Sequence, residues 1–123
     1  MSAHKTLYIG IAPRSYLKAR TIAIAKGEKP YPDEPKHWVS SLEALGKILS
    51  EKNMLLIEMI RNSKPSSLAE LAALSGRKTS NLSRTLKAME RIGVVEFEQV
   101  SKIKKAPRVV YDKFEVKGLF LAA

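Results

Sequence analysis

The chain has 123 residues, of which 45% are hydrophobic and 28% charged, a balance typical of one globular domain rather than a disordered segment. The absence of cysteine excludes disulfides and thiolate metal sites, and no apolar run approaches the roughly 18 residues that a membrane-spanning helix needs. The formal net charge of +10 favours a polyanionic partner, although scattered lysines that only keep a protein soluble would give the same total.

The N-terminal region predicts a strand followed by a helix. Thr6–Ile11 is short, apolar and β-prone, and Pro13 suits the first turn of a helix that ends near Gly27. Residues 28–37 hold three prolines and several charges, so we expect an irregular connector. Residues 1–37 therefore form an N-terminal strand-helix arm with its connector. Whether this arm packs on its own body or on a second subunit is left open.

Two helices are predicted next. Ser41 opens the first, which runs to about Leu49, and Ser50 or Asn53 caps the second, which runs to about Arg61. The apolar residues of the first helix are expected on one side: Leu42, Leu45 and Ile48. Those of the second are too widely spread for one stripe, which predicts burial on more than one side: Met54, Leu55, Ile57, Met59 and Ile60.

The stretch from residue 66 to residue 93 predicts two helices joined by a tight turn. Ser67 caps the first helix, with Glu70 placed to complete a capping box. Gly76 supplies the backbone freedom that the turn needs, and the second helix is expected at about residues 78–92. The expected buried face of the first helix is Leu68, Leu71, Ala72 and Leu74. This is the pattern of a helix-turn-helix, which places its second helix in a DNA major groove.

The C-terminal part predicts a β-hairpin. Residues 94–100 and 108–116 alternate apolar and polar side chains around the basic loop 101–107, and residues 118–123 form a short apolar tail. We therefore expect a mainly α fold with a small β-hairpin wing, in the α+β class. Its DNA-binding domain would be residues 38–117.

The second helix of the pair has two distinct faces. At about 100° per residue, the core stripe is Leu82, Leu86 and Met89. The opposite face is polar and basic: Ser80, Arg84, Lys87 and Arg91. The one acid of the helix, Glu90, lies to the side. Residues 77–113 hold ten basic and four acidic residues, so most of the positive excess is local.

These features define a candidate DNA interface. An Asn such as Asn81 can bond adenine, an Arg such as Arg84 can bond guanine, and lysines of the loop would contact phosphate. The candidate residues are Arg77, Lys78, Thr79, Ser80, Asn81, Ser83, Arg84, Lys87, Arg91, Lys102, Lys104, Lys105 and Arg108. Two plainer readings stay open: Thr79 or Ser80 only caps the helix, and the lysines only guard a hairpin against aggregation.

The part of the chain that holds the two helices and the hairpin resembles the winged helix-turn-helix of MarR- and ArsR-like transcriptional regulators. The resemblance covers roughly residues 50–116. It rests on Leu71-Ala72, Gly76, Ser83-Arg84-Thr85-Leu86 and Gly93-Val94. Lys78 replaces the usual Ser at the helix cap, which leaves the helix start uncertain by one residue. The chain lacks an extra helix pair for MarR-type dimerisation and a cysteine metal site of the ArsR type. Metal or thiol sensing is therefore not implied.

The whole chain also resembles a family of small predicted prokaryotic DNA-binding proteins. Their middle segment corresponds here to residues 36–45, which read KHWVSSLEAL. Some members are encoded beside toxin genes, and the resemblance therefore implies an antitoxin and autorepressor role as an alternative.

Taken together, the sequence predicts a sequence-specific double-stranded DNA-binding transcriptional regulator, with an antitoxin that neutralises a partner toxin as the alternative. Because paired half-sites strengthen binding, we expect a homodimer, joined first through the arm and second through the tail. RNA binding is a further alternative. No enzyme motif, cofactor or metal is expected, since His4 and His37 have no ligand spacing around them. The N-terminus lacks the apolar core of a signal peptide, which predicts a cytoplasmic protein without membrane contact.

Overall fold

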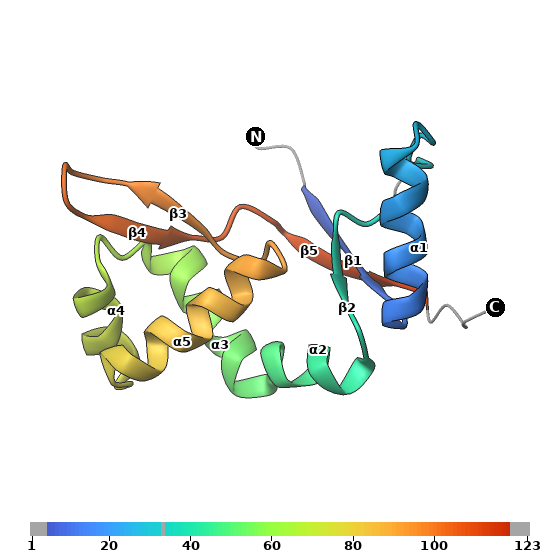
Figure 1. The fold of residues 1–123 in the computed structure, drawn as a ribbon. Coiled ribbons are helices and arrows are strands. Elements are labelled where there is room, and N and C mark those ends of the chain that lie inside the picture. Colours follow the sequence, from blue (N-terminus) through green and yellow to red (C-terminus); the bar gives the residue numbers. More distant parts are fainter. Residues whose placement is uncertain (1–4, 33, 119–123) are drawn as a thin grey trace.

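The computed structural model describes residues 5–32 and 34–118, which build five helices and two small sheets. Figure 1 shows α1 and a three-stranded sheet at one end of the molecule, with α4 and a two-stranded hairpin at the other. The elements in chain order are β1 (Thr6–Ile11), α1 (Arg14–Ala25), β2 (His37–Val39), α2 (Leu42–Ile48), α3 (Glu51–Ser63), α4 (Leu68–Ser75), α5 (Thr79–Arg91), β3 (Glu96–Gln99), β4 (Lys105–Arg108) and β5 (Lys113–Lys117). The fold combines helices with small sheets and is compatible with the expected α+β class.

The three-stranded sheet is parallel throughout, in the order β2-β1-β5. The predicted strand β1 is confirmed and lies in the centre, where Ile9 pairs with His37 on one side and Val116 on the other. Strand β2 was not predicted, because residues 28–37 were expected to be irregular up to His37. Three residues are too few to show the alternation that identifies a strand in sequence.

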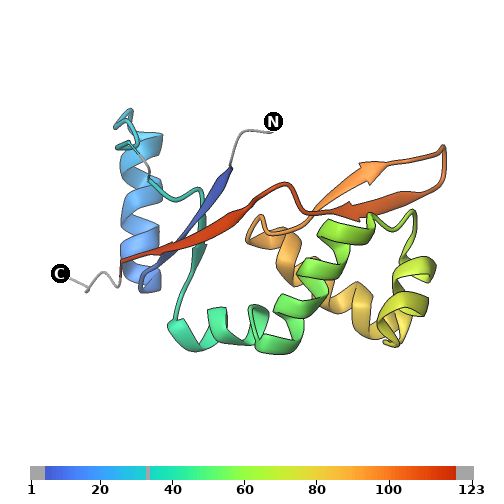
Figure 2. The ribbon, with the colours of Figure 1, turned by 180° about the vertical axis from the view of Figure 1, so that it is seen from behind.

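Helix α1 follows β1 closely and lies against the face of the sheet that carries Trp38 (Figure 2). Pro13 occupies the N-cap position, one residue before the predicted first turn. The predicted end is confirmed: Gly27 has a φ of +104°, and the N–H of Glu28 reaches back to the carbonyl of Ala23 at 3.1 Å. These contacts form the usual left-handed termination of a helix.

The N-terminal arm packs on its own body. Leu7, Ile9 and Ile11 are 4%, 0% and 2% exposed and belong to the same hydrophobic cluster as the helices. The arm and the rest of the chain therefore share one core. Its buried members are Leu7, Ile9, Ile11, Val39, Leu45, Leu56, Ile57, Ile60, Leu71, Leu82, Leu86, Met89, Ile92, Val94 and Val95.

Helices α2 and α3 begin at the predicted caps, but they bury less than expected. The side chains of Ser41 and Ser50 each accept a hydrogen bond from a backbone N–H in the first turn. Leu42 and Leu55 are each 61% exposed, so two expectations were wrong: that Leu42 shares the buried side of α2, and that α3 is buried on more than one side. The buried residues of α3 are Leu56, Ile57 and Ile60, which form a single stripe.

The predicted cap of α4 is confirmed with one change. The Oγ of Ser67 accepts a hydrogen bond from the N–H of Glu70 at 3.0 Å. The carboxylate of Glu70, however, accepts from the N–H of Ser66 at 2.8 Å rather than from that of Ser67. The capping box therefore begins one residue earlier than expected, at Ser66. Leu74, expected on the buried face, is 48% exposed.

The predicted hairpin is present but shorter. Strands β3 and β4 pair antiparallel, from Glu96 opposite Arg108 to Gln99 opposite Lys105. The prediction that residues 108–116 form its second strand was wrong, since Lys105–Arg108 already forms that strand and Lys113–Lys117 pairs with β1. A segment with alternating apolar and polar residues can pair with the hairpin strand or with β1, so the tertiary fold decides which strand it joins. Of the apolar tail, residues 119–123 lie outside the described residues.

Candidate nucleic-acid interface

A sharp turn sets the direction of α5 relative to α4. Gly76 has a φ of +72°, and its N–H bonds to the carbonyl of Ala72 at 2.9 Å. Lys78 then takes the N-cap position with an extended backbone and makes no side-chain cap, and α5 begins at Thr79. The predicted helix of about residues 78–92 is confirmed within one residue at each end.

The two predicted faces of α5 are both observed. Leu82, Leu86 and Met89 are 0%, 1% and 0% exposed. The side chains on the opposite side are exposed, and we call its three cations the basic face: Arg84, Lys87 and Arg91. Because the leucines anchor the helix on the core, the cations are directed away from it.

The charges of the basic face are not neutralised within the part of the chain that the structure describes. None of its three cations forms an ion pair there, and the one hydrogen bond from them is a long one, from Arg91 Nε to the carbonyl of Lys87 at 3.5 Å. Like charges on neighbouring helical turns cost a few tenths of a kcal/mol each. Such a surface favours an anionic partner.

The first turns of α5 present short polar side chains. Thr79, Ser80 and Asn81 are exposed, and Ser83 is half-buried. None of these side chains caps the helix, which sets aside the reading that Thr79 or Ser80 serves only as the cap. Hydroxyl and amide groups at this end are free to bond an approaching ligand.

The basic tip of the hairpin is ordered by its own hydrogen bonds. Ser101 Oγ accepts from the N–H of Lys104 at 3.1 Å, and the side-chain amide of Gln99 donates to the carbonyl of Ser101 at 2.7 Å. Lys102 and Lys104 are exposed at this tip, and Lys105, predicted in the loop, is exposed at the start of β4. The lysines are therefore held on a defined turn.

A groove of about 350 Å³ separates α5 from the hairpin. Lys87 lines it from the helix and Lys105 lines it from β4, together with Ser83 and Phe97. The helix and the hairpin therefore direct cations to the same side of the molecule. Glu90 also lines this groove, which the sequence reading missed when it placed Glu90 to the side. The signal was present, because Glu90 follows Lys87 by three residues and so lies on the next turn.

Arg77 was a candidate contact, but its guanidinium is bonded within the protein. Nη1 donates to Asn53 Oδ1 and Nη2 donates to the carbonyl of Lys52, both at 3.0 Å. The residue is half-buried and ties the turn before α5 to the first turn of α3. Its partners lie 24 and 25 residues away in sequence, so no local pattern could reveal them.

Arg108 is held in the same manner. Its Nε pairs with Glu98 at 3.0 Å, and its Nη1 donates to the carbonyl of Pro65 at 2.7 Å. The side chain therefore fixes the hairpin to the loop before α4. The structure brings together eleven of the thirteen candidates as exposed or half-buried groups of α5, its start and the hairpin, and it uses Arg77 and Arg108 internally.

Over residues 5–32 and 34–118, His, Asp and Glu side chains do not gather in groups of three that could hold a metal ion. The same ranges contain no helix with both the length and the apolar character needed to cross a bilayer.

The chain matches a protein-family model. No curated protein matches the chain. The model of the HVO_A0114 family matches residues 48–116, which run from the end of α2 into β5 and include α5, the hairpin and the groove between them. Because this match spans more than half of the 123 residues, the chain belongs to the HVO_A0114 family.

Proposed function

We propose that α4, α5 and the β3–β4 hairpin form a winged helix-turn-helix, and that the protein is a sequence-specific double-stranded DNA-binding transcriptional regulator. One observation carries the proposal: one unpaired cation of α5, Lys87, and one of the hairpin, Lys105, line the same groove from its two walls, with Glu90 beside Lys87. A DNA backbone carries one negative charge per about 1.7 Å of helix axis and would neutralise both elements at once.

In this proposal α5 is the recognition helix and enters the major groove. Arg84 is the residue suited to guanine, because a guanidinium can donate to O6 and N7 together, and Asn81 is suited to adenine. Both are exposed on the outer side of the helix. The preceding Lys78 and the polar Thr79 and Ser80 would bond phosphates and so fix the register of the helix.

The hairpin acts as the wing. Lys102 and Lys104 at its tip would contact the backbone or the minor groove beside the site of α5. Arg77 and Arg108 take a different role from the one their charge suggests. They are positioning residues, since each holds one DNA-binding element against the body through hydrogen bonds.

The activity proposed is binding rather than catalysis, and it would take place in the cytoplasm. We propose that two copies bind together, because paired half-sites one helical turn apart give a small module the affinity that a regulator needs. The site would then be a palindrome. Since β1 is used within its own chain, a dimer through the arm would have to use α1 or a sheet edge.

Selection of bound sequences from random duplex DNA tests the proposal. We expect an enriched site with two related halves. The Arg84→Ala variant should lose about 1–3 kcal/mol of discrimination at one base position of each half. Arg14→Ala is the matched control, because Arg14 is exposed on α1 at the other end of the molecule (Figure 1). Equal binding of selected and random DNA by the native protein would contradict sequence-specific regulation.

A second candidate is an antitoxin that binds a partner protein. The observation in its favour is α1, which has no buried residue and exposes Ile22 and Ile24 by 45% and 40%. Because β1 is buried, such a partner would have to bind α1 and the connector. A toxin encoded beside the gene, purified with this protein, should protect α1 from protease. Unchanged cleavage of α1 in the mixture would contradict this role.

A further inference from the structure

A second hollow lies at the opposite end of the molecule from the groove. It is a half-open cleft of about 850 Å³ between α1, the connector and the strands β1 and β2. Four aromatic side chains line it, from four different segments of the chain: Tyr8, Tyr31, Trp38 and Tyr111. Leu17 and Ile24 add aliphatic surface from α1. A hollow of this size is within the range of small-molecule sites.

Trp38 is held firmly in the wall of the cleft. It pairs with Gly10 across the sheet, and a Cβ added at Gly10 would lie 2.3 Å from its ring. Its ring also packs against that of Tyr16, with centroids 5.9 Å apart. On the same face, Lys117 Nζ lies 4.8 Å above the ring of Tyr8. The aromatic surface is therefore preformed, which favours flat ligands that stack.

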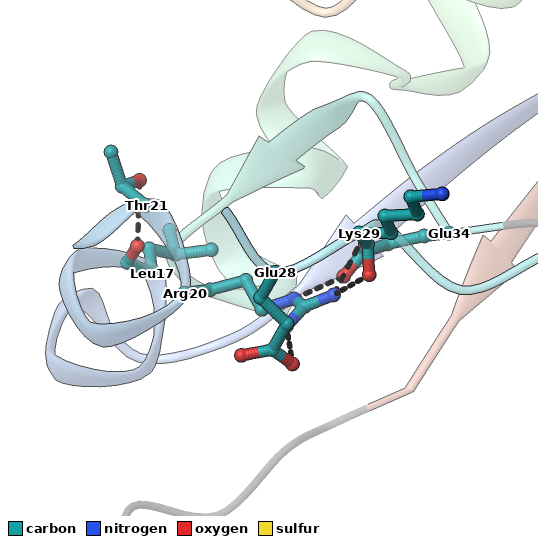
Figure 3. A network of polar contacts seen from close by, with 6 residues as sticks. All are labelled: Leu17, Arg20, Thr21, Glu28, Lys29 and Glu34. Carbon is teal, nitrogen blue, oxygen red and sulfur yellow. Dashed lines mark hydrogen bonds and ion pairs between the residues drawn. The ribbon is translucent and has the colours of Figure 1, made fainter. Parts of the chain in front are cut away.

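Two charged groups of the cleft, Arg20 and Glu34, bond each other, and a third, Lys36, lines it as an exposed cation. Figure 3 shows the guanidinium of Arg20 between the two carboxylates that it bonds, Glu28 at 2.6 Å and Glu34. Its Nη2 also donates to the carbonyl of Lys29 at 3.4 Å, and Thr21 Oγ1 donates to Leu17 at 2.8 Å. Arg20 is thus committed to the protein and offers no free charge to a ligand.

His37 connects this cleft to the end of α5. It precedes Trp38 in β2, and its imidazole lies where a Cβ on Gly93 would be placed, with Nε2 at 2.6 Å. Gly93 has a φ of +82° and follows α5 directly. A shift of β2 would therefore be felt at the C-terminal end of the helix that carries the basic face.

We propose that this cleft is a binding site for a planar aromatic small molecule, and that its occupancy alters the DNA affinity of α5 through His37 and Gly93. The effect on DNA affinity rests on the function proposed above, whereas ligand binding in the cleft does not. The aromatic side chains of the lining supply the stacking surface.

The protein contains a single tryptophan, so Trp38 reports on the cleft alone. Titration of the full chain with 2-naphthol should quench Trp38 fluorescence to saturation and reduce its quenching by acrylamide. Decahydro-2-naphthol, the saturated analogue, should compete at least ten-fold more weakly, because it cannot stack. Absence of saturable quenching, or equal competition by the saturated analogue, would overturn the assignment.

Thr21→Phe fills the cleft from an exposed position of α1, and Ala19→Phe adds the same ring on the outer side of that helix. We expect Thr21→Phe to weaken 2-naphthol binding at least ten-fold and Ala19→Phe to leave it unchanged. Circular dichroism checks that both variants are folded. Protection of Trp38 from acrylamide in the native protein tests the site without either variant. Equal affinity in the two variants would overturn the site.

The DNA measurement separates the two parts. Saturating 2-naphthol should change the affinity for a selected duplex at least three-fold. Binding of 2-naphthol with no change in DNA affinity would overturn the coupling through His37. A native protein that binds no DNA would overturn the function proposed above, while the Trp38 titration would still decide whether the cleft binds ligand.

Discussion

The guanidinium of Arg77 donates a 3.0 Å hydrogen bond to Asn53 Oδ1, which joins the turn before α5 to the first turn of α3. The side chain of Asn53 is itself held, since its Nδ2 donates to the carbonyl of Ile48 at 3.0 Å. A residue that would be read as a DNA contact from its charge thus belongs to a network that fixes the orientation of α5.

Replacing Arg77 should affect stability rather than the ionic part of DNA binding. Arg77→Ala removes two charge-assisted hydrogen bonds, so we expect a loss of about 1.5 kcal/mol in the free energy of unfolding by urea. Arg84→Ala, at an exposed position of the same region, should stay within about 0.5 kcal/mol. An unchanged stability of Arg77→Ala with a flatter salt dependence would instead make Arg77 a phosphate contact.

The lysines of the hairpin tip should set the salt dependence of DNA binding. Lys104→Gln removes one exposed cation, and each phosphate contact contributes about 0.9 to the slope of log K against log salt. We expect the slope to fall by about that amount, equally on selected and random duplexes. Lys18→Gln, exposed on α1, is the control and should not change the slope. A base-dependent effect of Lys104→Gln would show that the tip reads sequence.

A buried leucine of α5, Leu82, and an exposed leucine of α3, Leu55, should differ in how much they contribute to stability. Leu82 lies on the buried side of α5 and is 0% exposed, and Leu82→Ala should lower the free energy of unfolding by about 2–5 kcal/mol. Leu55 is 61% exposed on α3, and Leu55→Ala should stay within about 0.5 kcal/mol. Urea unfolding followed by circular dichroism measures both. A large loss in Leu55→Ala would mean that a partner or second copy covers this side of α3.

Replacing glycine by alanine should have opposite effects on stability at Gly10 and at Gly46. Gly10→Ala places a Cβ 2.3 Å from the Trp38 ring, so the ring must move, and we expect a loss of about 1–3 kcal/mol with a shift in Trp38 emission. Gly46 lies within α2 with nothing within 4 Å of its Cβ position, and Gly46→Ala should gain about 0.5–1 kcal/mol. Thermal unfolding and fluorescence of both variants check the pair.

Glu70 should make stability depend on pH in the acid range. The hydroxyl and N–H of Ser66 donate to its carboxylate and lower its pKa below the ordinary value of 4.5. A lowered pKa in the folded state stabilises the fold above the ordinary value, and this stabilisation is lost as the pH falls through the lowered one.

The Glu70→Gln variant should therefore unfold at a lower temperature than the native protein at pH 7. The difference should shrink steadily below about pH 4. Glu58→Gln is the matched control, because Glu58 is exposed on α3 and has no bonded partner among the described residues. A difference between Glu70→Gln and the native protein that stays constant from pH 7 to pH 3 would contradict the role of the Ser66 contacts.

Much of the secondary structure was readable because its causes are local. Ser41 and Ser67 each cap the helix that they were predicted to open, and Ser50 is the one of the two candidates, Ser50 and Asn53, that caps α3, since a cap depends only on residues within one turn. Gly27 and Gly76 end their helices for the same reason. The buried stripe of α5 followed from a spacing of three and four residues alone.

The existence and polarity of α5, with its leucines inward and its cations outward, follow from the order of its amino acids. The packing of the whole chain, by contrast, pairs Lys113–Lys117 with β1 rather than with the hairpin and uses Arg77 and Arg108 internally. It also leaves some apolar side chains exposed, such as Leu55. Periodicity and capping act over a few residues, whereas the pairing of a strand and the partner of a long cation depend on which distant segments the fold brings together.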